Sequence, residues 1–91
     1  MLLRGQGGRI DLLCYEKTAQ RYLVIELKNV RASRNTIGQV ASYLGWVNEH
    51  FRGRRKARGL VIARGFDNMF LSAASAIPSV GYLTLKELGL E

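Results

Sequence analysis

The sequence is poor in cysteine, histidine and acidic residues, and each shortage excludes a class of protein. Its single cysteine, Cys14, cannot form an internal disulfide, which is typical of a chain that folds in a reducing cytoplasm. One cysteine and one histidine, His50, are too few ligands for a structural zinc site. No apolar run is long enough to cross a bilayer, and we expect neither a signal peptide nor membrane association.

Two common catalytic motifs are also missing. There is no Gly-x-x-x-x-Gly-Lys-Ser/Thr loop to hold the phosphates of a nucleotide, which argues against nucleotide hydrolysis. Ser72 and Ser75 have no histidine at a suggestive position, so a serine hydrolase triad is not indicated. Seven acidic residues stand against 14 lysines and arginines, for a formal net charge of +7. This excess favours polyanionic partners, most simply nucleic acid, over the alternative of a merely basic protein.

The length of 91 residues, 47% of them hydrophobic, predicts a single small domain over residues 1–91, either complete or a fragment of a longer protein. Hydrophobic periodicity predicts the order β-β-α-β-α-β and a mixed sheet flanked by helices. The expected strands cover residues 9–15, 21–28, 59–63 and 80–84, and the expected helices 34–51 and 68–77. We expect connections at 1–8, 16–20, 29–35 and 64–67 and a final helical turn at 85–88, with Ser33 or Asn35 capping the first helix and Asp67 the second.

Two carboxylates on neighbouring strands are the most informative feature. Asp11 lies on the first predicted strand, and Glu26 and Lys28 share one face of the second with Val24, while we expect Leu27 and its odd-numbered neighbours to point into the core. If the two strands form a hairpin, Asp11 comes beside Glu26. Two carboxylates and the backbone carbonyl of Leu27 would form a site of hard oxygen ligands that suits Mg²⁺ or Mn²⁺.

The order of these residues resembles the PD-(D/E)xK nuclease superfamily, and within it the NucS-type and RecB-like endonucleases. The matching segments are a Gly-x-x-Asp-Leu-Leu stretch at residues 8–13, a Val-x-Glu-Leu-Lys strand at 24–28, a Gln-x-x-x-Tyr helix at 39–43 and an Arg-Gly-Leu-Val-Ile-Ala strand at 58–63. The resemblance runs from about Gly5 to the C-terminus. It implies an α/β restriction-endonuclease-like core, although too few residues precede Asp11 for the helix that usually opens that core.

The resemblance also implies an activity and a set of residues for it. It implies a Mg²⁺- or Mn²⁺-dependent nuclease that cuts DNA in repair, restriction or mobile-element biology. Asp11, Glu26 and Leu27 would hold the metal, and Lys28 would position a water or neutralise the transition state. Gln39 and Tyr43 would face the metal site and complete the catalytic set.

A second group of residues is expected to contact the nucleic acid. The loop of residues 52–58 carries five cations in seven residues, more than a helix C-terminus needs, although a solvated turn is the alternative. Trp46 and His50 share a helix side with Gln39 and Tyr43, opposite the buried stripe of Ile37, Val40, Ala41, Leu44, Val47 and Phe51. The predicted nucleic-acid contacts are Arg9, Arg31, Arg34, Trp46, His50, Arg52, Arg54, Arg55 and Lys56.

Other readings of the same residues stay open. A nucleic-acid-binding module with a vestigial acidic pair would keep the basic loop, and a structural ion-pair network would keep Asp11, Glu26 and Lys28. A side of the first helix with small residues (Gly38, Ser42 and Gly45) would pack on an intrachain neighbour or on a second copy in a homodimer. NucS-type proteins carry an additional N-terminal DNA-binding region, which this sequence does not show.

Overall fold

The computed structural model describes residues 3–5 and 8–91, with side chains from residue 11 onward. The strands are β1 (Leu3–Gly5), β2 (Gly8–Ile10), β3 (Leu12–Glu16), β4 (Arg21–Ala32), β5 (Arg58–Phe66) and β6 (Val80–Thr84), and the helices are α1 (Arg34–His50) and α2 (Asn68–Ser75). Within this part of the chain no helix is both long and apolar enough to span a membrane.

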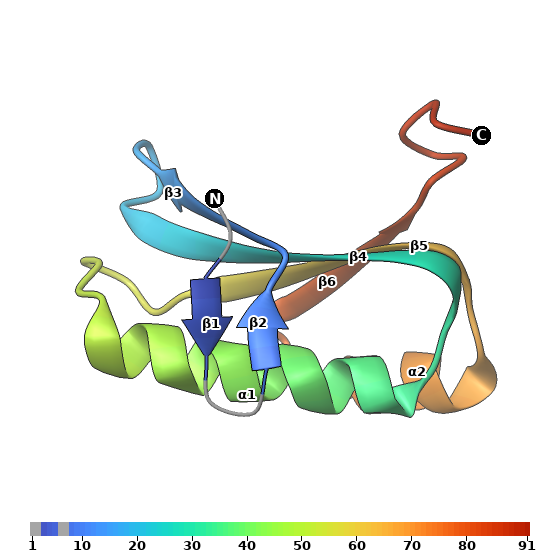
Figure 1. Ribbon diagram of the computed structural model, residues 1–91, viewed down its shortest axis with the longest axis horizontal. Coiled ribbons are helices and arrows are strands. Elements are labelled where there is room, and N and C mark those ends of the chain that lie inside the picture. Colours follow the sequence, from blue (N-terminus) through green and yellow to red (C-terminus); the bar gives the residue numbers. More distant parts are fainter. Residues whose placement is uncertain (1–2, 6–7) are drawn as a thin grey trace.

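A mixed four-stranded sheet in the order β3-β4-β5-β6 forms the centre of the molecule (Figure 1). Strand β3 is antiparallel to β4, while β5 is parallel to β4 and β6 is parallel to β5. Strands β1 and β2 form a separate antiparallel pair beside α1. The predicted mixed sheet and the order β-β-α-β-α-β are therefore confirmed from β3 onward.

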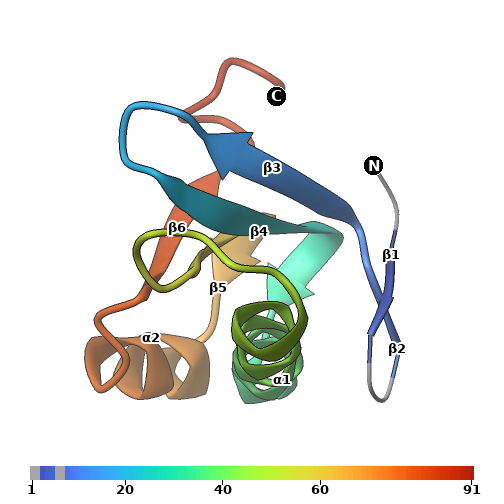
Figure 2. The ribbon, with the colours of Figure 1, turned by 90° about the vertical axis from the view of Figure 1, so that its left-hand side faces the viewer.

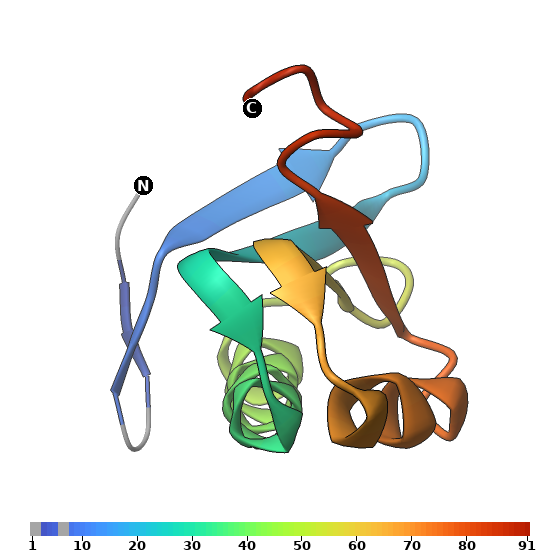
Figure 3. The same cartoon turned by 90° about the vertical axis from the view of Figure 1, so that its right-hand side faces the viewer.

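Both helices lie on the same face of the sheet, as the two end views show (Figures 2 and 3). The core between the helices and the sheet contains the fully buried Val24, Val40, Val47, Val61 and Phe70. Each such side chain contributes about 1.5–3 kcal/mol by leaving water. The other face of the sheet carries no helix, and on it the side chain of Leu27 is 50% exposed.

Helix α1 crosses β5 very closely at Gly59. A Cβ atom at this position would lie 2.5 Å from Cγ1 of Val40 and 3.5 Å from Cδ1 of Leu44, so the approach requires glycine. The predicted stripe of α1 is confirmed at Ile37, Val40, Leu44 and Val47, but it is wrong at Ala41, which is exposed.

Several predicted boundaries are wrong, and most err in the same direction. Strand β4 continues to Ala32 through the expected connection, and β5 continues to Phe66 through the expected turn. These ends mix polar and apolar residues, but they pair with each other, with Arg31 opposite Gly65 and Ala32 opposite Phe66. The first predicted strand breaks at Asp11 into β2 and β3, the expected loop 1–8 contains β1, and α2 ends at Ser75.

The caps of the two helices differ. Asp67 caps α2 as predicted, because its Oδ1 accepts a hydrogen bond from the backbone N–H of Phe70 at 2.8 Å. Ser33 occupies the N-cap position of α1 but makes no side-chain capping bond there. The final strand β6 has the predicted bounds, and residues 85–89 turn after it.

Candidate active site

Glu26 is a buried carboxylate on the helix-covered face of β4. Only 4% of the residue is exposed, and it shares this face with the fully buried Val24. The prediction that Leu27 and its odd-numbered neighbours would point into the core is therefore wrong. The even-numbered residues face the helices, so Glu26 lies between the sheet and the helix layer rather than in open solvent.

Asp11 lies at the bend between β2 and β3, next to Glu26. The register of the antiparallel pair puts Leu12 opposite Ile25, so the preceding Asp11 falls level with Glu26 on the adjacent strand. Oδ2 of Asp11 accepts a hydrogen bond from the backbone N–H of Leu27 at 2.9 Å. This bond holds the carboxylate against β4, and the predicted meeting of the two acidic residues is confirmed.

The backbone carbonyl of Leu27 points toward the same side as its N–H group, because both groups of a strand residue address the same neighbouring strand. Since the N–H of Leu27 donates to Asp11, the carbonyl oxygen also lies on the Asp11 side of β4. The carboxylate of Asp11 and the carbonyl of Leu27 therefore lie on the same side of β4, level with Glu26 in the strand register, and their binding of a metal stays a prediction.

Lys28 supplies the positive charge of the site. Its Nζ lies 3.3 Å from Oε2 of Glu26, and 29% of the lysine side chain is exposed. The other carboxylate oxygen of Glu26, Oε1, is buried and has no hydrogen-bond partner within the part of the chain that the structure describes. One oxygen is therefore paired, and the other has lost water without gaining a donor.

The surroundings of Glu26 raise its pKa above the ordinary value of 4.5. Loss of hydration on burial is the largest cause, and the negative charge of Asp11 adds to it. The hydrogen bond and the positive charge of Lys28 act in the opposite direction but do not cancel the increase in the pKa. An additional cation beside Oε1 would relieve this penalty.

The oxygen atoms present suit a hard divalent cation. Two carboxylates and a carbonyl are the ligand types that Mg²⁺ and Mn²⁺ accept, with water filling the remaining positions. Over residues 11–91, no group of three or more histidine, cysteine, aspartate or glutamate side chains could hold a metal ion. A cation here would therefore depend on this acidic pair together with backbone and water oxygens.

Gln39 and Tyr43, on α1, differ in their surroundings. Gln39 is exposed, as expected, but Tyr43 is only 5% exposed and belongs to the hydrophobic core, so its predicted place opposite the buried stripe is wrong. The reason is helical geometry, since Val40 and Val47 lie three residues before and four after Tyr43 and so occupy the same side. Their roles beside the acidic pair stay predictions.

Trp46 and His50 form a stacked pair near the end of α1. Their ring centroids are 4.5 Å apart with an interplanar angle of 21°. Nδ1 of His50 lies 2.9 Å from the backbone carbonyl of Trp46, which can only accept, so Nδ1–H donates and Nε2 is left for another partner. Trp46 also packs against the core while His50 is exposed. Their contact with nucleic acid stays a prediction.

The predicted cationic residues outside the site lie mainly at one end of the molecule. Arg52, Arg54, Arg55 and Lys56 are exposed in the loop after α1, and Arg31 and Arg34 are exposed near its start. The backbone of Arg9 lies in β2, but its side chain is outside the described residues. On the small-residue side of α1, a Cβ added at Gly38 or Gly45 would meet no described atom within 4 Å, and the packing of this side on an intrachain neighbour or on a second copy stays a prediction.

Comparison of the whole structure with solved structures decides the fold. The chain has a nuclease-like fold. It is similar to a repair endonuclease from Pyrococcus abyssi, with a TM-score of 0.74 and 19% sequence identity over 90% of this chain. It is equally similar to EndoMS in a complex with double-stranded DNA, with a TM-score of 0.74 and 22% identity over 92% of this chain.

The match covers 36% and 35% of those two chains, so this chain spans about a third of their length. No family model matches the sequence, and no curated protein sequence matches it at a significant level. The nuclease-like fold therefore rests on structure, and it agrees with the resemblance that the sequence motifs suggested.

One polar residue of this nuclease-like fold escaped the sequence analysis. Oδ1 of Asn48, near the end of α1, accepts a hydrogen bond from the backbone N–H of Ala57 at 2.8 Å and so closes the basic loop. No pattern in the sequence marks Asn48, because its partner is a backbone group nine residues away. Only the folded loop shows the contact.

Proposed function

We propose that this chain is the catalytic part of a metal-dependent DNA endonuclease that hydrolyses phosphodiester bonds. The observation that carries the proposal is the buried Oε1 of Glu26, which has no described partner although it sits beside Asp11 and Lys28. A carboxylate in this state is costly to keep unless a cation binds to it.

In this proposal Asp11, Glu26 and the carbonyl of Leu27 hold Mg²⁺ or Mn²⁺. When bound, the cation supplies Lewis-acid polarisation of the scissile phosphate and a water molecule of lowered pKa. Asp11 is already oriented by its bond to the backbone of Leu27, so little reorganisation is needed before binding. Glu26 keeps Lys28 at the site through their ion pair.

The ammonium group of Lys28 has two uses in the reaction. It places a positive charge beside the oxygen atoms on which negative charge increases during hydrolysis, and it can orient the attacking water through one of its N–H groups. Gln39, which is exposed on α1, would orient Lys28 or contact the DNA backbone. Tyr43 would support the site from the core, where its ring is fixed by packing.

Two further observations support DNA as the substrate. The chain carries a net charge of +7, which favours a polyanion. The similar solved structures are a repair endonuclease and an EndoMS complex with double-stranded DNA, which supports a role in DNA repair.

The direct test is cleavage of labelled single-stranded, duplex, forked and junction DNA with Mn²⁺, with Mg²⁺ and with EDTA. We expect cutting that needs the metal and that is lost in Glu26→Ala. Glu49→Ala is the matched control, because Glu49 is an exposed acidic residue on α1 and its removal changes the net charge equally. Cleavage that persists in Glu26→Ala would refute the assignment of this residue.

A folded protein that binds DNA but never cuts it would favour the inactive binding module. In that case Mn²⁺ and Mg²⁺ would leave both the DNA affinity and the melting temperature unchanged. The same experiment therefore separates an enzyme from a domain that has kept only its DNA-binding surface.

A further inference from the structure

A pocket of about 280 Å³ lies where α1 ends, away from the acidic pair. It is lined by Asn48 and Phe51 at the end of the helix and by residues 52–56 of the basic loop. Four of these five loop residues are cations, and no acidic residue contributes to the lining. Among the described residues, none of these four cations has a carboxylate within ion-pair distance, so their charge is available to an anion.

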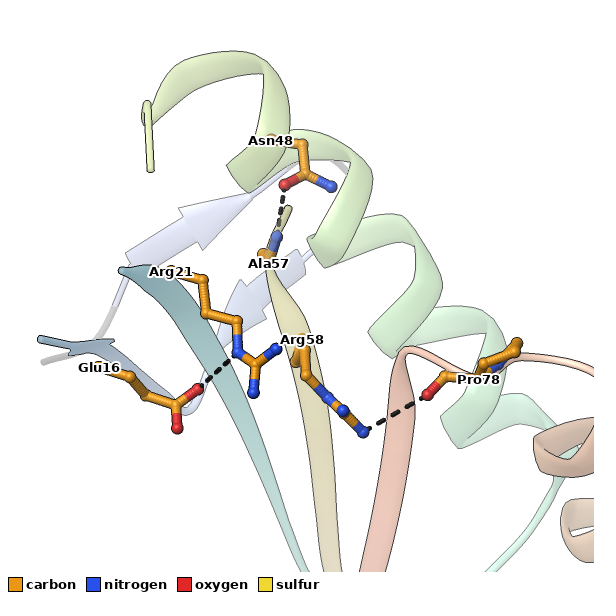
Figure 4. A network of polar contacts seen from close by, with 6 residues as sticks. All are labelled: Glu16, Arg21, Asn48, Ala57, Arg58 and Pro78. Carbon is orange, nitrogen blue, oxygen red and sulfur yellow. Dashed lines mark hydrogen bonds and ion pairs between the residues drawn. The ribbon is translucent and has the colours of Figure 1, made fainter. Parts of the chain in front are cut away.

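The loop around this pocket is held in place from two sides. The N–H of Arg55 donates to the carbonyl of Gln20 at 3.1 Å, which ties the loop to the turn between β3 and β4. On the other side, the N–H of Ala57 donates to Asn48, as Figure 4 shows. These bonds set the loop before any ligand binds, which reduces the entropy lost on binding.

Gly53 lets the loop lie close to the sheet. A Cβ at this position would be 3.1 Å from the carbonyl oxygen of Arg55, 3.3 Å from Cα of Arg21 and 3.4 Å from the carbonyl oxygen of Gln20. All three are backbone atoms, which cannot move aside as a flexible side chain would. The backbone of the loop is therefore packed against the turn before β4, and it carries the four exposed cationic side chains around the pocket.

The pocket is displaced from the acidic pair along the direction of β4. The loop is bonded to Gln20, just before β4 begins at Arg21, whereas Glu26 lies six residues after Gln20. At about 3.3 Å per residue this separation is about 20 Å. Figure 1 shows the loop at the end of the sheet where β4 starts.

This separation can be compared with the dimensions of a DNA duplex. One helical turn is about 34 Å long, and its major and minor grooves are about 12 and 6 Å wide. If the grooves share the turn in proportion to their widths, the major groove takes about 23 Å along the axis. The backbone of the second strand thus faces the protein about 23 Å along the axis from the phosphate of the first, which is close to the separation of about 20 Å between the pocket and the acidic pair.

We propose that the pocket binds a phosphate of the complementary strand, across the major groove from a phosphate held by the ammonium group of Lys28 beside Glu26. The inference rests on the proposed function and adds a duplex laid along β4, with its two strands contacted at separate places. The loop would act as a backbone clamp that positions the duplex without reading its sequence.

The test is phosphate interference with a duplex in which single phosphates are replaced by neutral methylphosphonates, measured in EDTA so that nothing is cut. Three proteins are compared: the wild type, Lys28→Gln, and the double variant Arg54→Gln/Arg55→Gln. Lys86→Gln is the matched control for Lys28→Gln, because Lys86 is an exposed cation after β6 and its replacement also removes one charge. Circular dichroism checks that each variant folds.

We expect two groups of sensitive phosphates in the wild type, on opposite strands and about six base pairs apart, the spacing that 20 Å gives at 3.4 Å per step. The double variant should lose one group and Lys28→Gln the other. Each lost phosphate contact should lower the affinity about fivefold at physiological salt and reduce the salt slope by about 0.9.

An unchanged interference pattern and salt slope in a folded double variant would overturn the inference, and so would two sensitive groups on the same strand. Failure of the proposed function can be distinguished from failure of this inference, because in that case the wild type would show no metal-dependent cleavage. The interference pattern in EDTA does not depend on that cleavage.

Discussion

Replacing Glu26 by glutamine removes the buried negative charge and a proposed metal ligand together. Stability without metal then reports the free-energy cost of the charge, and stability with metal reports its role in cation binding. Glu26 is 4% exposed and its Oε1 has no described partner, so burial of the ionised carboxylate destabilises the folded protein. An unsatisfied buried polar group costs about 1–3 kcal/mol and a charged one costs more, so removing the charge lowers the cost even though the amide N–H groups that replace Oε1 would also lack a described partner. Glutamine keeps the length of the side chain, and its amide oxygen can still accept from Lys28, whose partly exposed ammonium group also reaches water.

Without metal we therefore expect Glu26→Gln to be about 1 kcal/mol more stable than the wild type, which for a chain of this size raises the melting temperature by about 4–8 °C. The measurement is thermal denaturation followed by circular dichroism in EDTA at neutral pH. Glu49→Gln is the control, because it changes the net charge equally at an exposed position of α1 and should leave the melting temperature nearly unchanged.

Adding Mn²⁺ should reverse the order of stability. A ligand at a hundred times its dissociation constant stabilises the folded wild type by about 2.7 kcal/mol, which exceeds the gain of the variant. Glu26→Gln should gain little, because a neutral amide is a poor ligand for the cation. This reasoning would be refuted if Mn²⁺ left the melting temperature of the wild type unchanged, or if the variant were less stable than the wild type in EDTA. Either result would favour a structural ion-pair network.

The pH dependence follows from the raised pKa of Glu26. Because its folded pKa lies above the ordinary 4.5, the folded protein holds this proton more tightly than the unfolded chain. The protonated form of Glu26 therefore stabilises the wild type fully below pH 4.5, and this stabilisation is lost as the pH rises through the raised pKa. The advantage of Glu26→Gln over the wild type should be largest above the raised pKa and should disappear as the pH falls below 4.5, which urea titrations at several pH values would show.

Two predictions concern the scaffold. Gly59→Ala should destabilise the protein by about 1–3 kcal/mol, because the new Cβ would lie 2.5 Å from Cγ1 of Val40. Gly81→Ala is the control and should be tolerated, because the nearest atom to its new Cβ is 3.8 Å away. Equal urea midpoints for the two variants would contradict this prediction. Asp67→Ala should cost about 1 kcal/mol through the lost cap on Phe70, and an unchanged melting temperature would show that the cap contributes nothing.

Local chemistry explains what could be predicted from the sequence. Asp67 was expected to cap α2 because a short acidic side chain before a helix can accept a hydrogen bond from a free backbone N–H of the first turn. The structure has that bond, from the N–H of Phe70. The meeting of Asp11 with Glu26 was expected from a hairpin whose turn lies between the two strands, and the register with Leu12 opposite Ile25 confirms it. Both inferences depend on neighbours close in sequence.

Contacts between distant segments explain where the predictions failed. The last four residues of β4, Asn29 to Ala32, alternate polar with apolar residues over too short a stretch to predict a strand, yet they pair with the end of β5 after a register shift between Lys28 and Arg31. Neither end would be a strand alone, and each is stabilised by the other. Asn48 was missed for the same reason, since its partner Ala57 reaches it only when the loop folds back.

The face of β4 that carries Glu26 is the most consequential error, and topology explains it. Both faces of β4 are apolar, with Val24 on one and Leu27 on the other, so the pattern alone cannot say which is covered. The parallel steps from β4 to β5 and from β5 to β6 run in the same direction across the sheet. Because such crossovers are right-handed, α1 and α2 must cover the same face.

That face is the one that Glu26 and Lys28 occupy, and the chemistry of the site follows from this. On the bare face the carboxylate of Glu26 would be hydrated and would lack the burial that raises its pKa. Beneath the helices it is dehydrated and keeps one oxygen without a described donor. The arrangement of strands, more than the motif itself, therefore creates the demand for a cation on which the proposed nuclease activity depends.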